Sequence, residues 1–271
     1  MLFKEKNCSE CGSNYDVVEA TCPHCHAPNR DFKALKIPSH HVWLPIYKQL
    51  IIFLLGIVAL NLVSLVLSLT ISRYFEEDSV TLLLILNYTR YLVVAGAICA
   101  TLIGSYPKLK SSFTDWLPYL VGFFAGFLLI GVNLAYNATV GLFYEMETND
   151  NQTLANALVL TYPLLSVLLL GFIGPAVEEF TYRVGLFSFL TRIHRSVAYI
   201  VTILIFAFIH FDFTAIGDAL INEFVHLPVY MISGAALCVL YDTLGLSASL
   251  TAHVVNNILS TLPVIIVGAM Q

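Results

Sequence analysis

Charged side chains are scarce in this sequence. Asp, Glu, Lys and Arg together make up 11% of its 271 residues, whereas an ordinary soluble domain carries about 25%. Hydrophobic residues make up 58% of the chain, and the mean hydropathy is +0.80. This balance excludes a soluble globular chain and predicts a polytopic membrane protein.

Three further patterns are missing. The net charge of −5 is spread over loops and forms no basic patch, so nucleic acid is not expected as a partner. There is no H-E-x-x-H, which excludes the usual zinc-protease helix and leaves only a zinc site assembled from separate helices. No internal repeat is visible, although many transporters carry paired half-sequences.

Four of the six cysteines lie near the N terminus, as "CSEC" from Cys8 to Cys11 and "CPHC" from Cys22 to Cys25. Two such pairs can enclose a structural Zn²⁺ tetrahedrally, and the metal replaces the core that so short a segment cannot build. We therefore predict a zinc ribbon over residues 1–36. Rubredoxin-type iron would fit the same four ligands, and two disulfides are the alternative in an exported domain. A four-thiolate site has no open position, so the ribbon is expected to dock or regulate.

A tether over residues 37–45 leads into an all-α membrane domain, predicted for 46–271. A span needs about 20 apolar residues. We expect seven spans, at about 46–71, 81–104, 117–142, 155–177, 197–211, 225–241 and 248–268, with an extra embedded helix near 178–191, hence seven to eight transmembrane helices. Within the third span, Gly122 and Gly126 form a G-x-x-x-G, which lets two helices approach closely, within one chain or between two.

The loops between these spans alternate in charge. Acidic loops occupy 73–79, 144–151 and 211–224. The basic residues beside the other span ends are Lys33, Lys36, Lys48, Lys108, Lys110, Arg183, Arg192 and Arg195. The positive-inside rule then places the N terminus and the ribbon in the cytoplasm and the C terminus outside. With no eukaryotic feature visible, we expect an integral protein of a bacterial plasma membrane.

A few polar residues interrupt the apolar runs. An Asp at the centre of a membrane helix costs roughly 2.5–3.5 kcal/mol on insertion scales, so each of these residues needs a reason. The set consists of Arg90, Glu178, Glu179, Arg183, His210, His253, Asn256 and Asn257. All but Arg90 lie in the last hundred residues, and the sequence does not name a partner for Arg90.

Helical spacing assigns different tasks to the two glutamates. Glu179 and Arg183 stand at i and i+4 on one face, where an ion pair neutralises both. Glu178 is rotated by about 100° from Glu179, so it is left free to act as a general base.

His210 ends one span, and His253 projects beside Asn257 one turn later in the last span. A carboxylate with a histidine can activate water, and imidazole and amide donors can receive an oxyanion, which points to acyl-transfer hydrolysis.

These residues match a known family. The three motifs are Glu178-Glu179-x-x-x-Arg183, Phe206-x-x-x-His210 and His253-x-x-x-Asn257, in this order on successive helices. Over roughly residues 155–268 the chain resembles the CPBP, or Abi, intramembrane proteases, which include the type II CAAX prenyl endopeptidases and bacterial relatives linked to bacteriocin immunity and pheromone maturation. The resemblance implies that Glu178 is the catalytic base, acting with His210 on water, and that Glu179 and Arg183 organise the site.

The resemblance also implies that His253 and Asn257 form the oxyanion pocket, although Asn256 competes for this place. The expected function is therefore an intramembrane endopeptidase that cuts peptides or small proteins near the cytoplasmic membrane face, with no catalytic metal. One alternative is a zinc protease in which Glu178, His210 and His253 are ligands. The others are a transporter and a non-catalytic scaffold or immunity protein whose ribbon holds a cytosolic or membrane partner.

Overall fold

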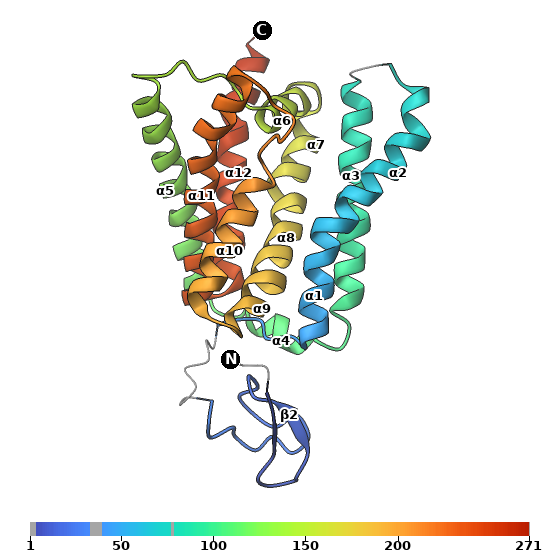
Figure 1. Cartoon of the computed structure of the whole chain (residues 1–271), viewed down its shortest axis with the longest axis vertical. Helices are drawn as coiled ribbons and strands as arrows, with labels where there is room; N and C mark the ends of the chain where they lie inside the picture. The colour runs from blue at the N-terminus through green and yellow to red at the C-terminus, as the bar shows by residue number, and fades with distance from the viewer. Residues whose placement is uncertain (1–3, 33–39, 77–78, 271) are drawn as a thin grey trace.

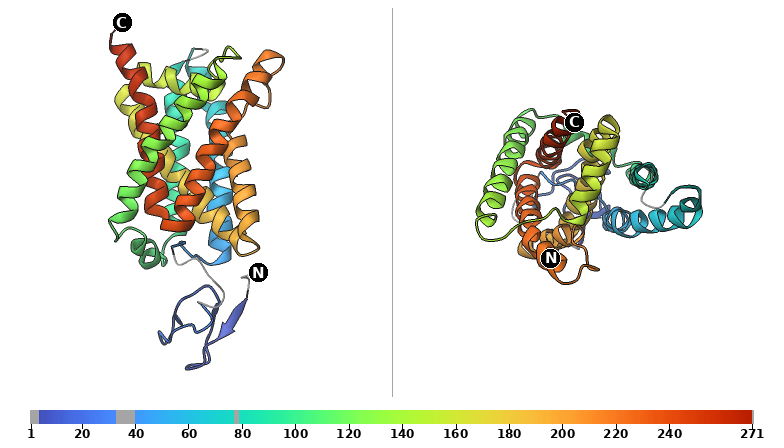
Figure 2. Two further views of the ribbon diagram at one scale, coloured as in Figure 1. Left: turned by 90° about the vertical axis from the view of Figure 1, so that its left-hand side faces the viewer. Right: turned by 90° about the horizontal axis from the view of Figure 1, so that it is seen from above.

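The computed structural model describes residues 4–32, 40–76 and 79–270, which form a helical bundle with a small head at one end (Figure 1). Its strands are β1 (Glu5–Asn7) and β2 (Asn14–Asp16) and its α-helices are α1 (Ile46–Leu54), α2 (Leu60–Ile71), α3 (Val80–Thr101), α4 (Tyr106–Ser111), α5 (Leu117–Val140), α6 (Asp150–Thr161), α7 (Pro163–Leu168), α8 (Gly174–Glu179), α9 (Ser188–Thr191), α10 (Arg195–Phe208), α11 (Asp218–Leu244) and α12 (Leu246–Ala269). π-Helical stretches cover Leu55–Ala59, Leu169–Ile173 and Phe180–Phe187, and a 3₁₀ turn covers Ser72–Tyr74. The head and the C-terminal end of α12 lie at opposite ends of the molecule (Figures 1 and 2).

The number of full-length spans is lower than the sequence predicts. In the described part of the chain, six helical segments are long and apolar enough to cross a membrane: Ile46–Tyr74, Val80–Thr101, Leu117–Val140, Pro163–Thr191, Asp218–Leu244 and Leu246–Ala269. The predicted span at 197–211 is instead α10, with 14 residues. At 1.5 Å per residue it covers about 21 Å, less than the hydrocarbon thickness of about 30 Å. The chain that follows α10 completes the passage to the far end.

The predicted boundary between a span at 155–177 and a separate helix at 178–191 is also wrong. α6 ends at Thr161, and helical structure then runs without a break from Pro163 to Thr191. The break lies at Tyr162, which has φ −133° and ψ 64°, because a residue before proline is disfavoured in the α region. This shift places Glu178 near the middle of a 29-residue membrane segment, well away from either end.

Two glycines set how closely α5 and α12 pack. A Cβ on Gly122 would lie 2.4 Å from the carbonyl oxygen of Ala248, and one on Gly126 would lie 2.7 Å from the side chain of Val255. Such distances are far inside van der Waals contact. The G-x-x-x-G therefore serves packing within the chain, and it positions the helix that carries His253.

The first prediction concerns this contact. Gly122→Ala is expected to destabilise the protein by roughly 1–3 kcal/mol, because the added methyl meets backbone that no rotamer change can move aside. Gly131→Ala on the same helix is the matched control, since a Cβ there meets nothing within 4 Å and alanine favours the helix. Thermal unfolding in detergent measures both variants. Equal stabilities would contradict the packing role of Gly122.

The head is docked on the membrane domain by charge pairs. Asp16 lies 3.0 Å from Nη1 of Arg192, and Glu19 pairs with Lys108. The tether is fixed by His41, whose Nε2 lies 2.9 Å from a carboxylate oxygen of Asp242. Burial lowers the pKa of His41, so the neutral ring donates its Nε2–H to Asp242. The acidic side of the head thus meets the basic end of the bundle.

Candidate active site

The two adjacent glutamates lie on α8, between two π-helical stretches. π-Helical turns are frequent at functional sites because they displace side chains from the regular α-helical phase. The side chain of Glu179 is fully buried, whereas that of Glu178 remains 16% exposed. The two carboxylates therefore face different surroundings, as their helical spacing predicts.

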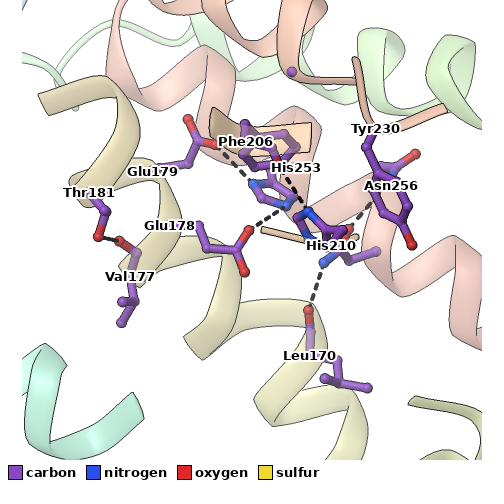
Figure 3. Close-up of polar contacts among 12 residues, drawn as sticks. Leu170, Val177, Glu178, Glu179, Thr181, Phe206, His210, Tyr230, His253 and Asn256 are labelled. Atoms are coloured by element: carbon purple, nitrogen blue, oxygen red, sulfur yellow. Dashed lines mark hydrogen bonds and ion pairs between the residues drawn. The ribbon is translucent and has the colours of Figure 1, made fainter. Parts of the chain in front are cut away.

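Glu179 is held from two sides. Its Oε1 lies 3.1 Å from Nη1 of Arg183, which is the predicted i,i+4 ion pair, and 2.9 Å from Nδ1 of His253 (Figure 3). The guanidinium of Arg183 also lies over the ring of Phe206, with Cζ 4.7 Å from the ring centroid. Because a carboxylate only accepts hydrogen bonds, Nδ1 of His253 carries the proton, and Nε2 is turned toward the other glutamate. Glu179 thus orients a histidine as well as an arginine.

Glu178 points into the open part of the site. Its Oε2 lies 3.7 Å from Nε2 of His253, and its Oε1 accepts a hydrogen bond of 3.4 Å from the hydroxyl of Tyr91. In Figure 3 its carboxylate and the ring of His210 are turned toward the same space beside His253. A partly exposed carboxylate with only long contacts has free lone pairs, so it can accept a proton from a bound water.

His210 is fixed at one nitrogen and free at the other. Its Nδ1 donates to the carbonyl oxygen of Phe206 at 2.8 Å, and its ring stacks on Tyr230 with centroids 4.4 Å apart (Figure 3). Since the carbonyl can only accept, Nδ1 carries the proton and Nε2 of the neutral ring is an acceptor. This tautomer suits a histidine that holds a water next to Glu178.

The two asparagines form a chain of amides. Asn257 donates from Nδ2 to the carbonyl oxygen of Leu170 at 2.9 Å, and Asn256 donates to Oδ1 of Asn257 at 3.2 Å. Both line the same cavity as His253. Each amide nitrogen has a second N–H, so either residue has a donor left for a substrate oxygen.

These side chains line one cavity of about 880 Å³. It extends from Glu178, His210 and His253 to the loop at 146–149 and to Pro263 and Val264 on the last turns of α12. That end of the bundle carries the C terminus and lies opposite the head (Figure 1). The two expectations of a cytoplasmic N terminus and a site near the cytoplasmic face therefore conflict, because the cavity leads away from the head.

The four cysteines are the only group of three or more potential metal ligands that come together within the described ranges, with their Sγ atoms within 4.8 Å of one another. Two Sγ–Sγ distances are 3.5 and 3.7 Å, for Cys8–Cys25 and Cys11–Cys22. A tetrahedral Zn²⁺ with Zn–S bonds of about 2.3 Å needs about 3.8 Å between sulfurs, so the site fits. Hydrogen bonds from the side chain and backbone of Ser13 lower the pKa of Cys11 to about 6, whereas the neighbouring thiols raise the pKa of Cys25, so Cys11 is the thiol that deprotonates first.

Two contacts of the site were not predicted from the sequence. Tyr91 reaches Glu178 from α3, and the one available signal was its neighbour Arg90, the only charged residue in that span. Tyr230 supports His210 from α11, and no local pattern marks it. Both contacts join different helical segments, so spacing along one helix could not reveal them.

Comparison with known proteins agrees with this geometry. Residues 160–259 match the family model of type II CAAX prenyl endopeptidase Rce1-like proteins. The matched segment contains Glu178, Glu179, Arg183, His210, His253, Asn256 and Asn257. No curated protein and no solved structure matches the chain. The family match identifies the chain as a membrane protease.

Proposed function

We propose that this membrane protease, whose residues 160–259 belong to the Rce1-like family of type II CAAX prenyl endopeptidases, cuts peptides or small proteins by a glutamate-type mechanism. The observation that carries the proposal is the position of Glu178: its carboxylate faces a membrane-embedded cavity beside His253, while Oε1 of the buried Glu179 is held by Arg183 and His253. One glutamate builds the site and the other acts on water.

The chemistry follows from these contacts. A water held between Glu178 and Nε2 of His210 gives its proton to Glu178 as its oxygen attacks the scissile carbonyl carbon. The oxyanion is received by the free amide N–H of Asn257, with Asn256 beside it, and by His253 when its Nε2 also carries a proton. When the C–N bond breaks, protonated Glu178 returns the proton to the leaving amine. Glu178 ends as a carboxylate, so the cycle closes.

We also propose an orientation. The head end carries the basic residues Lys48, Lys108 and Arg192, while the cavity end carries Glu145 and Glu147. The positive-inside rule therefore places the head in the cytoplasm, as expected from the sequence. With the head in the cytoplasm, the cavity would open toward the outer face of a bacterial plasma membrane. Cleavage would follow entry from outside or from the outer leaflet.

For the head we propose a structural Zn²⁺ held by the four cysteines of a ribbon over residues 1–36, joined by a tether at 37–45 to a membrane domain at 46–271. The charged surface by which it docks on the bundle includes Asp16 and Glu19. A partner that competes for this surface would be cytosolic or lie in the membrane. The metal's chemistry here is to hold the fold together.

A chelator separates this mechanism from a zinc protease. We expect a strong chelator to unfold the head, seen as new proteolytic cuts before residue 36, and to leave the hydrolysis of a fluorogenic peptide panel unchanged. The zinc alternative is tested in a Cys11→Ser/Cys25→Ser variant. The head of this variant is expected not to bind metal, so an effect of the chelator on activity would come from a catalytic metal. Loss of the variant's activity on chelation, with recovery on adding Zn²⁺, would overturn the metal-free mechanism.

A further inference from the structure

We infer that Tyr230 is a positioning residue for His210 and that the segment leading from α5 into α6 controls it. The main chain of Glu147 and the side-chain amides of Asn149 and Asn151 are bound to α11, and together they form what we call the rim strap. The inference rests on the proposed function, in which Nε2 of His210 holds the attacking water. It adds regulation to that site: a movement of the rim strap changes the rate of the chemical step through Tyr230.

The rim strap is fixed to one face of α11. Asn222, His226 and Tyr230 follow one another at intervals of four residues, so they lie along the same side of the helix. Asn222 and His226 both donate to the main-chain carbonyl oxygen of Glu147, at 3.1 and 2.7 Å. A carbonyl oxygen has two lone pairs, so these two bonds use its full capacity and fix the beginning of the strap.

Tyr230 holds the other end of the strap. Its hydroxyl oxygen accepts hydrogen bonds from the side-chain amides of Asn149 and Asn151, at 3.2 and 3.3 Å. Asn149 is buried, and its Oδ1 caps α6 by accepting from the main-chain N–H of Gln152 at 3.0 Å. A capping side chain has a set conformation, so the start of α6 fixes the amide that binds the phenol. The place of the Tyr230 ring is therefore determined from outside its own helix.

The same ring sets the plane of His210. The two rings are nearly parallel, with an interplanar angle of 10° and centroids 4.4 Å apart (Figure 3). The hydrogen bond from Nδ1 of His210 to the carbonyl oxygen of Phe206 fixes one atom of the imidazole, but one bond does not fix the tilt of the ring. The lone pair of Nε2 lies in the ring plane, so the tilt decides where a bound water sits relative to Glu178. A displacement of about 1 Å at a reacting group can cost about 10²-fold in rate.

The rim strap borders the cavity that holds the reacting groups. Residues 146–149 and Asn151 line this cavity, as do His226, Tyr230 and His210. A peptide that enters at this end passes the strap before it reaches Glu178. One side of Tyr230 thus binds the rim and the other side orders the histidine. The arrangement with all four strap bonds made is the competent one, and release of the strap lowers the rate without removing a reacting group.

The first test is a cycle of variants, measured as kcat and KM on a fluorogenic peptide with the full-length protein in detergent. Tyr230→Leu removes the stacked ring and is expected to lower kcat by about 10²-fold, with a smaller change in KM, because the ring places the water rather than the peptide. In a His210→Gln background the same replacement should cause no further loss, since effects that pass through one group are not additive. Equal losses in both backgrounds overturn the positioning role of Tyr230.

The second test changes the rim strap and leaves the ring in place. Tyr230→Phe keeps the stack and loses the acceptor oxygen, so it is expected to lower kcat by about threefold to tenfold, as the loss of an ordinary hydrogen bond does. Asn149→Ser/Asn151→Ser removes the two amides while serine still caps the helix, and the loss should be similar. The triple variant should lose no more than either. Full additivity of the two losses overturns the role of the strap.

Tyr136→Phe is the matched control. The Tyr136 hydroxyl donates to the carbonyl oxygen of Val225, also on α11, at 2.7 Å, so this variant loses a contact with the same helix and leaves Tyr230 unchanged. Its kcat should stay near that of wild type, and a loss equal to that of Tyr230→Phe overturns the inference. So does a loss of rate that follows the unfolding temperature across the variants. Equal peptide cleavage by wild type and Glu178→Gln would instead refute the proposed function.

Discussion

Replacement of Glu178 by Gln is expected to lower kcat/KM for peptide hydrolysis by roughly 10²- to 10⁴-fold, the contribution typical of a positioned general base. Gln keeps the shape and can still accept from Tyr91, so the fold should persist. What is lost is the ability to take a proton from water. The measurement is the rate on a fluorogenic peptide together with the unfolding temperature of each purified protein.

Glu147→Gln is the matched control for this experiment. Among the described side chains, Glu147 is the other carboxylate that lines the cavity, but it lies at the rim and its backbone carbonyl, rather than its side chain, binds Asn222 and His226. Its replacement should leave the rate near that of wild type. If both variants lose activity equally, the loss reflects a change in the charge of the cavity, and Glu178 is not the base.

The sequence predicted that Glu178, His210, His253 and Asn257 come together, and all four line one cavity, while their catalytic roles stay predictions. The three motifs lie on or directly after three separate helices, and the ion pair of Glu179 with Arg183 is present at i,i+4. The cysteine cluster of the head is also present, since two C-x-x-C turns bring four thiols together with few other constraints.

The sequence did not predict what depends on tertiary packing. Tyr162 and Pro163 moved the start of the fourth span, so Glu178 lies deeper than hydropathy indicated. The direction of the cavity follows from the way the loop at 146–149 and the end of α12 surround it. Hydropathy gives the length of a helix and its sidedness, but it does not show which end of a bundle is left open.

The second large effect is a difference between the stability lost on replacing Glu179 and that lost on replacing Arg183. Breaking a fully buried ion pair by removing one partner costs about 3–5 kcal/mol, because the other charge stays buried and uncompensated. The two removals differ here. After Arg183→Met, Glu179 still faces His253 at 2.9 Å, and the imidazole can take a proton to balance the charge. After Glu179→Gln, Arg183 cannot give up its charge, since a guanidinium is not deprotonated in proteins.

We therefore expect Glu179→Gln to lose the full amount of about 3–5 kcal/mol of stability and Arg183→Met to lose less. The measurement is the unfolding temperature of each variant in the same detergent. The double variant Glu179→Gln/Arg183→Met leaves no buried charge on this helix face, so it should be more stable than Glu179→Gln alone. It should remain inactive if Glu179 is needed to orient His253. Equal destabilisation by both single variants would show that His253 does not share the charge of Glu179. The site would then have an ion pair that is separate from its catalytic histidine.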